Sequence, residues 1–271
     1  MPERTQAASC VNAEVPFELR EGLIWVQVSI PQSAKPLNFM VDSGAGVSVI
    51  NLHTITRLGL RLGNRVSVRG VQTTVKGYWP ESMVARAGEV QLPTEYLAVD
   101  LGELSQSCTC AVDGLLGADF FKDRIVQIDY ADEKMRLLHS AEAGANDESV
   151  PLETRACGMR VPIQVNGGKQ QWVRLDTGCA SALQWVTSPV IAERCSRRPA
   201  IGVALVSISM TETAVRIGKT DFHGVPTGLH TREIFAGEAG LLGNGLLQRF
   251  STVTLDCKNA RLILGKSQIA P

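Results

Sequence analysis

The sequence has no surplus of charge and no long apolar run. Its 27 lysine and arginine residues balance 27 aspartate and glutamate residues in a chain of 271, so no overall field would attract nucleic acid or an anionic membrane. No apolar stretch reaches the roughly 18 residues that a membrane-spanning helix needs. The polar start, MPERTQAASC, shows no export signal. These absences predict a cytoplasmic protein, or a periplasmic or exported one if a leader has been removed, and they leave the compartment open.

Residues spaced for a metal are also missing. The seven cysteines are an odd number, and the closest two, Cys108 and Cys110, are separated by one residue, whereas zinc sites separate paired cysteines by about two to four. The sequence has neither His-Glu-x-x-His nor Gly-x-Ser-x-Gly, the motifs of zinc proteases and of many serine hydrolases. We therefore expect no metal, and free thiols by default, with a disulfide as the alternative.

An internal repeat is the main feature that is present. Asp42-Ser43-Gly44 follows the apolar segment LNFMV, and Asp176-Thr177-Gly178 follows QWVRL, 134 positions later. VDGLLGADFF, from position 112, matches EAGLLGNGLL, from position 238, which is 126 positions later. Both halves share one order: a hairpin, Asp-Ser/Thr-Gly, a variable segment, Leu-Leu-Gly and two closing strands. Such a repeat predicts two halves with similar folds.

Alternating apolar residues between turn residues predict a chain made mostly of β-strands. We expect an all-β fold of two small barrels, with the halves at residues 14–140 and 150–267. The small and polar segment 141–149 is expected to be a linker. Short helices are predicted from Leu52 to Leu60 and after each Leu-Leu-Gly.

Each acidic motif places a carboxyl group at the end of an apolar strand, in a turn where glycine permits close approach. If the two turns faced each other, Asp42 and Asp176 would repel as like charges, so the pair would share one proton. A water between them would meet a base and an acid, as attack on an amide carbonyl requires. A single copy would be interpreted as a simple turn, but two copies in matched repeats favour a catalytic pair.

With these motifs the chain resembles the aspartic proteases of the pepsin and retropepsin type, over about residues 17–266. DGLLGADFF is most similar to bacterial retropepsin-like proteins. The resemblance implies two pseudo-twofold-related retropepsin-like halves in one chain, acting as a monomeric endopeptidase on protein or peptide substrates. Two alternatives stay open: a peptide-binding or scaffolding module that hydrolyses little, and an obligate homodimer, which the fused repeat disfavours because the linker keeps the halves together.

The resemblance also assigns roles to individual positions. Asp42 and Asp176 would hold the nucleophilic water, without a metal or an organic cofactor. The residues that support this pair would be Ser43, Gly44, Thr177 and Gly178. A flap over the cleft is expected in RVSVRGVQTTVKGYW, with substrate-facing residues Gly70, Val71, Gln72, Thr73 and either Tyr78 or Trp79. The candidates for lining substrate pockets are Val47, Ile50, Val71, Leu183 and Ile208.

Two positions depart from the family pattern. Ala45 and Cys179 stand where pepsins have serine or threonine after the glycine, so a hydroxyl that would stabilise the ionised pair is absent. Hydrogen bonds to the charged form of a carboxyl group lower its pKa, so by analogy with retropepsins we expect activity to centre at about pH 5 to 7 rather than about pH 2.

Overall fold

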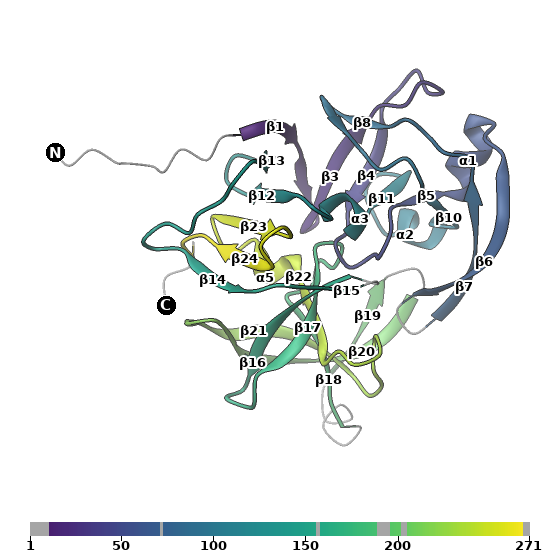
Figure 1. Ribbon diagram of the computed structural model, residues 1–271. Coiled ribbons are helices and arrows are strands. Elements are labelled where there is room, and N and C mark those ends of the chain that lie inside the picture. Colours follow the sequence, from purple (N-terminus) through teal and green to yellow (C-terminus); the bar gives the residue numbers. More distant parts are fainter. Residues whose placement is uncertain (1–10, 71–72, 156–157, 189–195, 202–204, 268–271) are drawn as a thin grey trace.

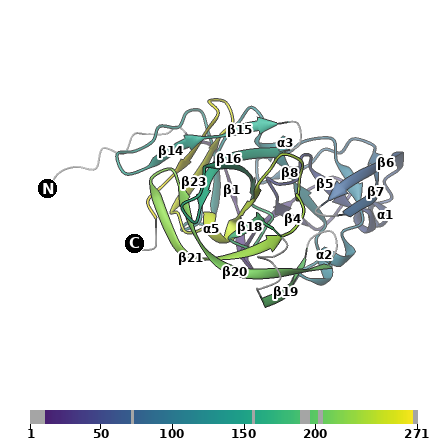
Figure 2. The same cartoon turned by 90° about the horizontal axis from the view of Figure 1, so that it is seen from below.

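The computed structural model describes residues 11–267 apart from 71–72, 156–157, 189–195 and 202–204. The chain consists mainly of β-strands, which form two lobes and a sheet that joins them (Figures 1 and 2). This confirms the prediction of an all-β fold with two similar halves. Within the described ranges, no helix is long and apolar enough to cross a membrane.

The first lobe is an eight-stranded sheet built from the first half of the chain. Its strand order is β2-β3-β4-β11-β5-β10-β7-β6. In chain order, its strands are β2 Glu18–Arg20, β3 Leu23–Val28, β4 Leu37–Val41, β5 Val49–Asn51, β6 Leu62–Gly70, β7 Thr73–Pro80, β10 Leu97–Val99 and β11 Gly114–Leu116. A separate two-stranded ribbon consists of β8 Arg86–Ala87 and β9 Val90–Gln91.

The second lobe repeats this sheet strand by strand. Its order is β15-β16-β17-β22-β18-β21-β20-β19, so β15 takes the place of β2, β17 that of β4, and β19 that of β6. The strands are β15 Glu153–Arg155, β16 Gly158–Val165, β17 Gln171–Asp176, β18 Leu183–Val186, β19 Ser196–Ile201, β20 Leu205–Ile217, β21 Thr220–His230 and β22 Gly240–Gly243.

The two sheets also agree in register at the strands that end in aspartate. β4 runs parallel to β11 with Met40 opposite Leu115, and β17 runs parallel to β22 with Arg174 opposite Leu241. In each lobe the Leu-Leu-Gly strand lies between this strand and an antiparallel neighbour, β5 or β18. The aspartate turn of each lobe is therefore anchored by a strand inserted beside it.

A six-stranded sheet joins the lobes and takes strands from both halves. Its order is β1-β13-β12-β23-β24-β14. The first three strands come from the first half of the chain, and the last three are their counterparts from the second half in reverse order. A pseudo-twofold axis therefore passes between β12 and β23. The strands are β1 Val11–Pro16, β12 Ile125–Asp129, β13 Lys134–Leu138, β14 Glu148–Pro151, β23 Thr252–Asp256 and β24 Arg261–Leu264. β1 begins before the first predicted half, and β14 begins inside the predicted linker; the boundaries themselves stay a prediction.

Short helices lie where the sequence predicted them. α1, Leu52–Leu58, begins at an Asn51 cap that accepts a hydrogen bond from the His53 amide, and it ends at Gly59, whose φ of 68° favours glycine. α3, Ala118–Phe121, and α5, Asn244–Leu247, follow the two Leu-Leu-Gly motifs. α2, Gly102–Gln106, was not predicted.

Two apolar clusters explain how the lobes hold together. The larger one spans both halves, with Phe39 and Phe120 from the first and Leu242 and Phe250 from the second all buried within it. A smaller cluster lies in the first lobe alone and includes Trp25, Met40, Leu97 and Leu115. This second cluster forms one wall of the site described below.

Candidate active site

The two aspartate loops are bound to each other by four buried hydrogen bonds. The Thr177 hydroxyl accepts from the Ser43 amide at 2.9 Å and donates to the Val41 carbonyl at 2.8 Å. The Ser43 hydroxyl accepts from the Thr177 amide at 3.0 Å and donates to the Leu175 carbonyl at 2.9 Å. Each hydroxyl thus bonds both to the opposite loop and to the opposite strand, which fixes the two loops face to face.

Two glycines allow the carboxyl groups to approach the opposite loop. A Cβ atom on Gly44 would lie 2.4 Å from Cγ of Asp176, and one on Gly178 would lie 2.5 Å from Cγ of Asp42. Both distances are shorter than any real carbon contact, so no larger residue fits at either position. The glycine of each motif is therefore required by the partner aspartate.

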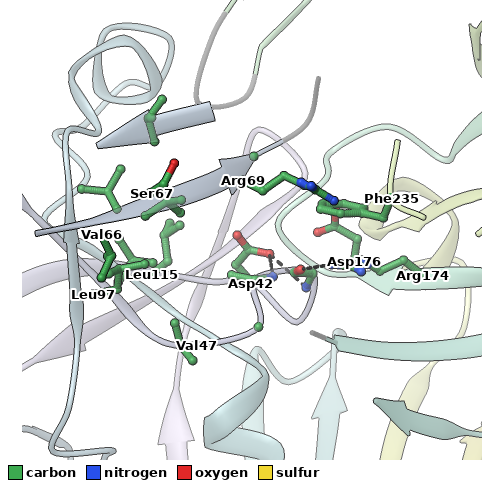
Figure 3. A pocket seen from close by; sticks show the side chains of 18 of the residues that line it. Asp42, Val47, Val66, Ser67, Arg69, Leu97, Leu115, Arg174, Asp176 and Phe235 are labelled. Atoms are coloured by element: carbon green, nitrogen blue, oxygen red, sulfur yellow. Dashed lines mark hydrogen bonds between the residues drawn. The ribbon is translucent and has the colours of Figure 1, made fainter. Parts of the chain in front are cut away.

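The carboxyl groups of Asp42 and Asp176 lie near each other, and each accepts hydrogen bonds from its own loop (Figure 3). Oδ1 of Asp42 accepts from the amides of Gly44 and Ala45, both at 3.0 Å. Oδ1 of Asp176 accepts from the amide of Gly178 at 3.0 Å. Asp42 thus has one more amide donor than Asp176.

The surroundings raise the pKa of both carboxyl groups. For Asp42, burial raises the pKa, and the Ala45 amide opposes the shift. For Asp176, burial and then the negative charge of Asp42 raise the pKa well above its usual range. Both pKa shifts belong to the coupled pair, which shares one proton, and the second amide donor at Asp42 favours the charge on that carboxyl group.

A buried ion pair beside the aspartates was not predicted from the sequence. Arg174 forms a bidentate pair with Glu238 at 2.8 and 2.9 Å, and these side chains are 5% and 7% exposed. Its guanidinium also donates to the Gly44 carbonyl at 3.0 Å and lies 3.5 Å from the ring centre of Phe235. The positive charge of Arg174 lowers the pKa of both aspartates, against the effect of burial.

The repeat held a signal for this ion pair. By the offset of the aspartate motifs, Arg174 corresponds to Met40, and by the offset of Leu-Leu-Gly, Glu238 corresponds to Val112. Met40 and Val112 are buried together in the apolar cluster of the first lobe. An arginine and a glutamate at two positions whose counterparts in the other half are apolar would have indicated a buried ion pair.

A cavity of 970 Å³ opens above the two aspartates. Its first-lobe side is apolar and includes Val49, Leu97 and Leu115, which belong to the smaller core cluster. The hairpin β6–β7 covers this side with Val75 and with Val66, which is labelled in Figure 3. The second-lobe side is mostly polar and charged.

The hairpin β6–β7 lies where the flap was expected, with some differences in detail. Gly70 lines the cavity and pairs with Thr73 at the start of β7, whereas Val71 and Gln72 are outside the described residues. Of the two aromatic candidates, Trp79 lines the cavity, while Tyr78 packs against the main core. Neighbouring residues of a strand point to opposite faces, so only one of the two can face the cavity.

The other pocket candidates are divided between the cavity and the core. Val47 lines the cavity, as expected. Ile50 and Leu183 are fully buried in the main core, and Ile208, although buried, is not part of the cavity wall. Periodicity cannot separate a residue that faces a cavity from one that faces the adjoining core, since both are apolar.

Cysteine chemistry plays no visible part in the described residues. Cys108, Cys110, Cys179 and Cys257 form no disulfide there. Burial raises the pKa of the Cys179 thiol to about 12, so this thiol is neutral beside the aspartates. The backbone amide of Ala45 donates to Asp42, and the alanine side chain has no hydroxyl that could add a second bond.

Comparisons with known proteins agree with this geometry. Residues 26–123 match a family model described as gag-polyprotein putative aspartyl protease. The crystal structure of an aspartic proteinase from Irpex lacteus matches with a TM-score of 0.61 at 13% identity, over 94% of this chain and 97% of that chain. No curated protein matches the sequence significantly. Residues 26–123 are thus similar to this aspartyl protease family model, and the whole chain shares the two-lobed fold of the Irpex lacteus proteinase.

Proposed function

We propose that this chain is an aspartic endopeptidase that cleaves peptide bonds in extended polypeptide segments, with one aspartate from each half of a monomer. The observation that supports this most is the pair of carboxyl groups of Asp42 and Asp176, which lie together at the floor of a 970 Å³ cavity on two loops that hydrogen-bond to each other. Neither aspartate loop could keep this position without the other, because their hydroxyl groups bond across the interface.

The chemistry follows from a pair that holds one proton. The ionised carboxylate, mainly Asp42, takes a proton from a water as the water oxygen bonds to the peptide carbonyl carbon. The protonated carboxyl, mainly Asp176, gives its proton to the carbonyl oxygen, so a neutral tetrahedral diol forms. When the diol collapses, Asp42 gives its proton to the amide nitrogen as the C–N bond breaks, and a diol hydroxyl gives its proton to Asp176 as the carbonyl forms again. This releases an acid and an amine and restores the single shared proton.

The cavity walls suit an extended chain. Val66, Val75 and Trp79 on the β6–β7 hairpin would cover a substrate that lies across the aspartates. An extended peptide can add its backbone to strand edges while alternate side chains enter pockets. The apolar first-lobe wall supports apolar side chains in at least one of these pockets.

Single substitutions of the two aspartates test the proposal. Incubation with an unbiased peptide library from about pH 3 to pH 8 should give cleavage by the wild type, and Asp42→Asn and Asp176→Asn should each lower kcat by about 100-fold or more. Circular dichroism would confirm that both variants are folded. Cleavage that survives in either variant would contradict a shared pair, and binding of peptides by the wild type without cleavage would favour the peptide-binding alternative.

A further inference from the structure

The charged wall of the second lobe occupies the position of an apolar cluster in the first. β3 pairs with β4 so that Trp25 is opposite Met40, and β16 pairs with β17 so that Arg160 is opposite Arg174. Arg160 is therefore the counterpart of Trp25, as Arg174 is of Met40. One lobe surrounds its side of the cavity with an apolar cluster, and the other with arginines.

Two of these arginines share one carboxylate. Arg160 and Arg155 both line the cavity, and both bond to one carboxylate, that of Glu153, with Arg155 donating from Nε at 2.8 Å and Arg160 from Nη2 at 2.6 Å. Arg160 is only 5% exposed, and its Nε has no hydrogen-bond partner. Arg160 also donates to the Gly237 carbonyl at 3.2 Å, which adds no negative charge. The group keeps a net positive charge beside the cavity.

Arg174 differs from this pair. Arg174 pairs one-to-one with Glu238 through two hydrogen bonds, and it also contacts the Gly44 carbonyl and the Phe235 ring. Arg174 therefore has a structural task in the site, whereas Arg155, which is 58% exposed at the rim, can reach a ligand.

A further cation faces the second lobe from the flap. Arg69, near the end of β6, is exposed and lines the cavity. Its side chain extends above Asp42 and Asp176 toward Phe235 (Figure 3). A substrate on the second-lobe side would thus have arginines on two sides.

We infer that the second-lobe side of the cavity is a subsite for an acidic side chain of the substrate, bound by Arg155, Arg160 and Arg69. This inference rests on the proposed function and names its substrate class: segments with an aspartate or glutamate on one side of the cleaved bond and an apolar side chain on the other. Guanidinium groups bind carboxylates in a planar, two-bond geometry, which a neutral amide of the same shape cannot match.

Matched peptides test the subsite. Each of the positions flanking the cleaved bond would carry Glu, Gln or Lys in turn, within one apolar sequence. At one position we expect kcat/KM to be about tenfold or more higher for Glu than for Gln, with Lys the poorest, as a charge-assisted bond predicts. The preference should fade below about pH 4, where the glutamate is protonated, and weaken with added salt.

Three variants connect the preference to these residues. Arg155→Gln should lower the ratio of kcat/KM for the Glu peptide to kcat/KM for the Gln peptide. Glu153→Gln should raise it, because the arginines lose their competing carboxylate; misfolding would not produce this increase. Arg20→Gln is the matched control, since Arg20 is the counterpart of Arg155 in the first lobe, pairs with Glu18 and does not line the cavity.

The outcomes separate this inference from the proposed function. If apolar peptides are cleaved well but Glu and Gln are equal at every position, the subsite is wrong and the protease is not. If the wild type cleaves no peptide, binding of the same peptides to the Asp42→Asn variant, measured by calorimetry, decides the subsite. Tighter binding of the Glu peptide than of the Gln peptide would support it, and equal binding would overturn it.

Discussion

At the scale of single residues, the buried guanidinium of Arg174 is a charge beside the aspartates that acts on both of them. Burial raises the pKa of both carboxyl groups, and this charge opposes the rise. Activity needs one carboxyl ionised and one protonated, so the acid limb of the pH profile follows the lower pKa of the pair and the alkaline limb the higher. Both pKa shifts are upward, so we predict a profile that lies above the one free aspartates would give, and the optimum near pH 5 to 7 stays a prediction.

Replacing Arg174 by the residue of the other half tests this. Arg174→Met removes a cation that lowers both pKa values, so the whole pH profile of kcat/KM should move to higher pH. The same variant leaves Glu238 buried without its partner, which costs about 3 to 5 kcal/mol of unfolding free energy, measured with urea.

The double variant Arg174→Met with Glu238→Val is the control, because it copies the Met40 and Val112 pair of the first lobe. It should recover most of the stability, and its profile should shift less than that of the single variant, because the negative charge of Glu238 is removed together with the positive charge of Arg174. A profile that stays in place or moves to lower pH in the single variant would show that Arg174 does not act on the aspartates through its charge.

At the scale of elements, the β6–β7 hairpin has two faces that differ in role. Val66 and Val75 face the cavity and the smaller core cluster, whereas Lys76 is exposed and does not line the cavity. The segment was predicted to be the flap, but the sequence left the choice between Tyr78 and Trp79 open. The choice depends on the register with β10, in which Tyr78 pairs with Ala98.

Substitutions on the two faces should therefore have different effects. Val75→Ser removes apolar contact with the substrate and should raise KM for apolar peptides by about five- to tenfold, from the usual value of a buried valine side chain. Lys76→Ser, one residue further along the same strand, should leave KM unchanged. Equal effects of the two variants, measured by initial rates, would show that the inner face of this hairpin does not contact the substrate.

At the scale of the whole molecule, the central sheet ties the two halves into one unit. β12 pairs along its length with β23, from Ile125 opposite Asp256 to Asp129 opposite Thr252. The main core cluster also takes residues from both halves. The aspartate pair lies at the same interface between the halves. It should therefore persist when the polypeptide between the halves is cut, because strand pairing and core packing hold the halves together.

Cutting the connection between the halves tests this dependence. A specific protease site inserted after Gly144, in an exposed segment before β14, should be cleaved without loss of activity, and the two fragments should elute together in gel filtration. Urea should separate them and abolish activity. Fragments that separate in native buffer would contradict the shared core, and specific activity of the uncut protein that falls on dilution would support the homodimer instead.

The sequence by itself determined the repeat, the all-β class and the residues of the two aspartate loops, because each of these depends on a local motif that occurs twice. The resemblance assigned the loop glycines and hydroxyls to the support of the aspartates, and in the structure the two hydroxyls form four cross-loop hydrogen bonds. Only the tertiary structure decided what surrounds them. Arg174 and Glu238 are 64 residues apart, and Arg160 becomes a cavity residue through strand pairing. Such contacts depend on the register between paired strands and on which face of a strand lies toward the cavity. A register shift of one residue would turn each side chain to the opposite face.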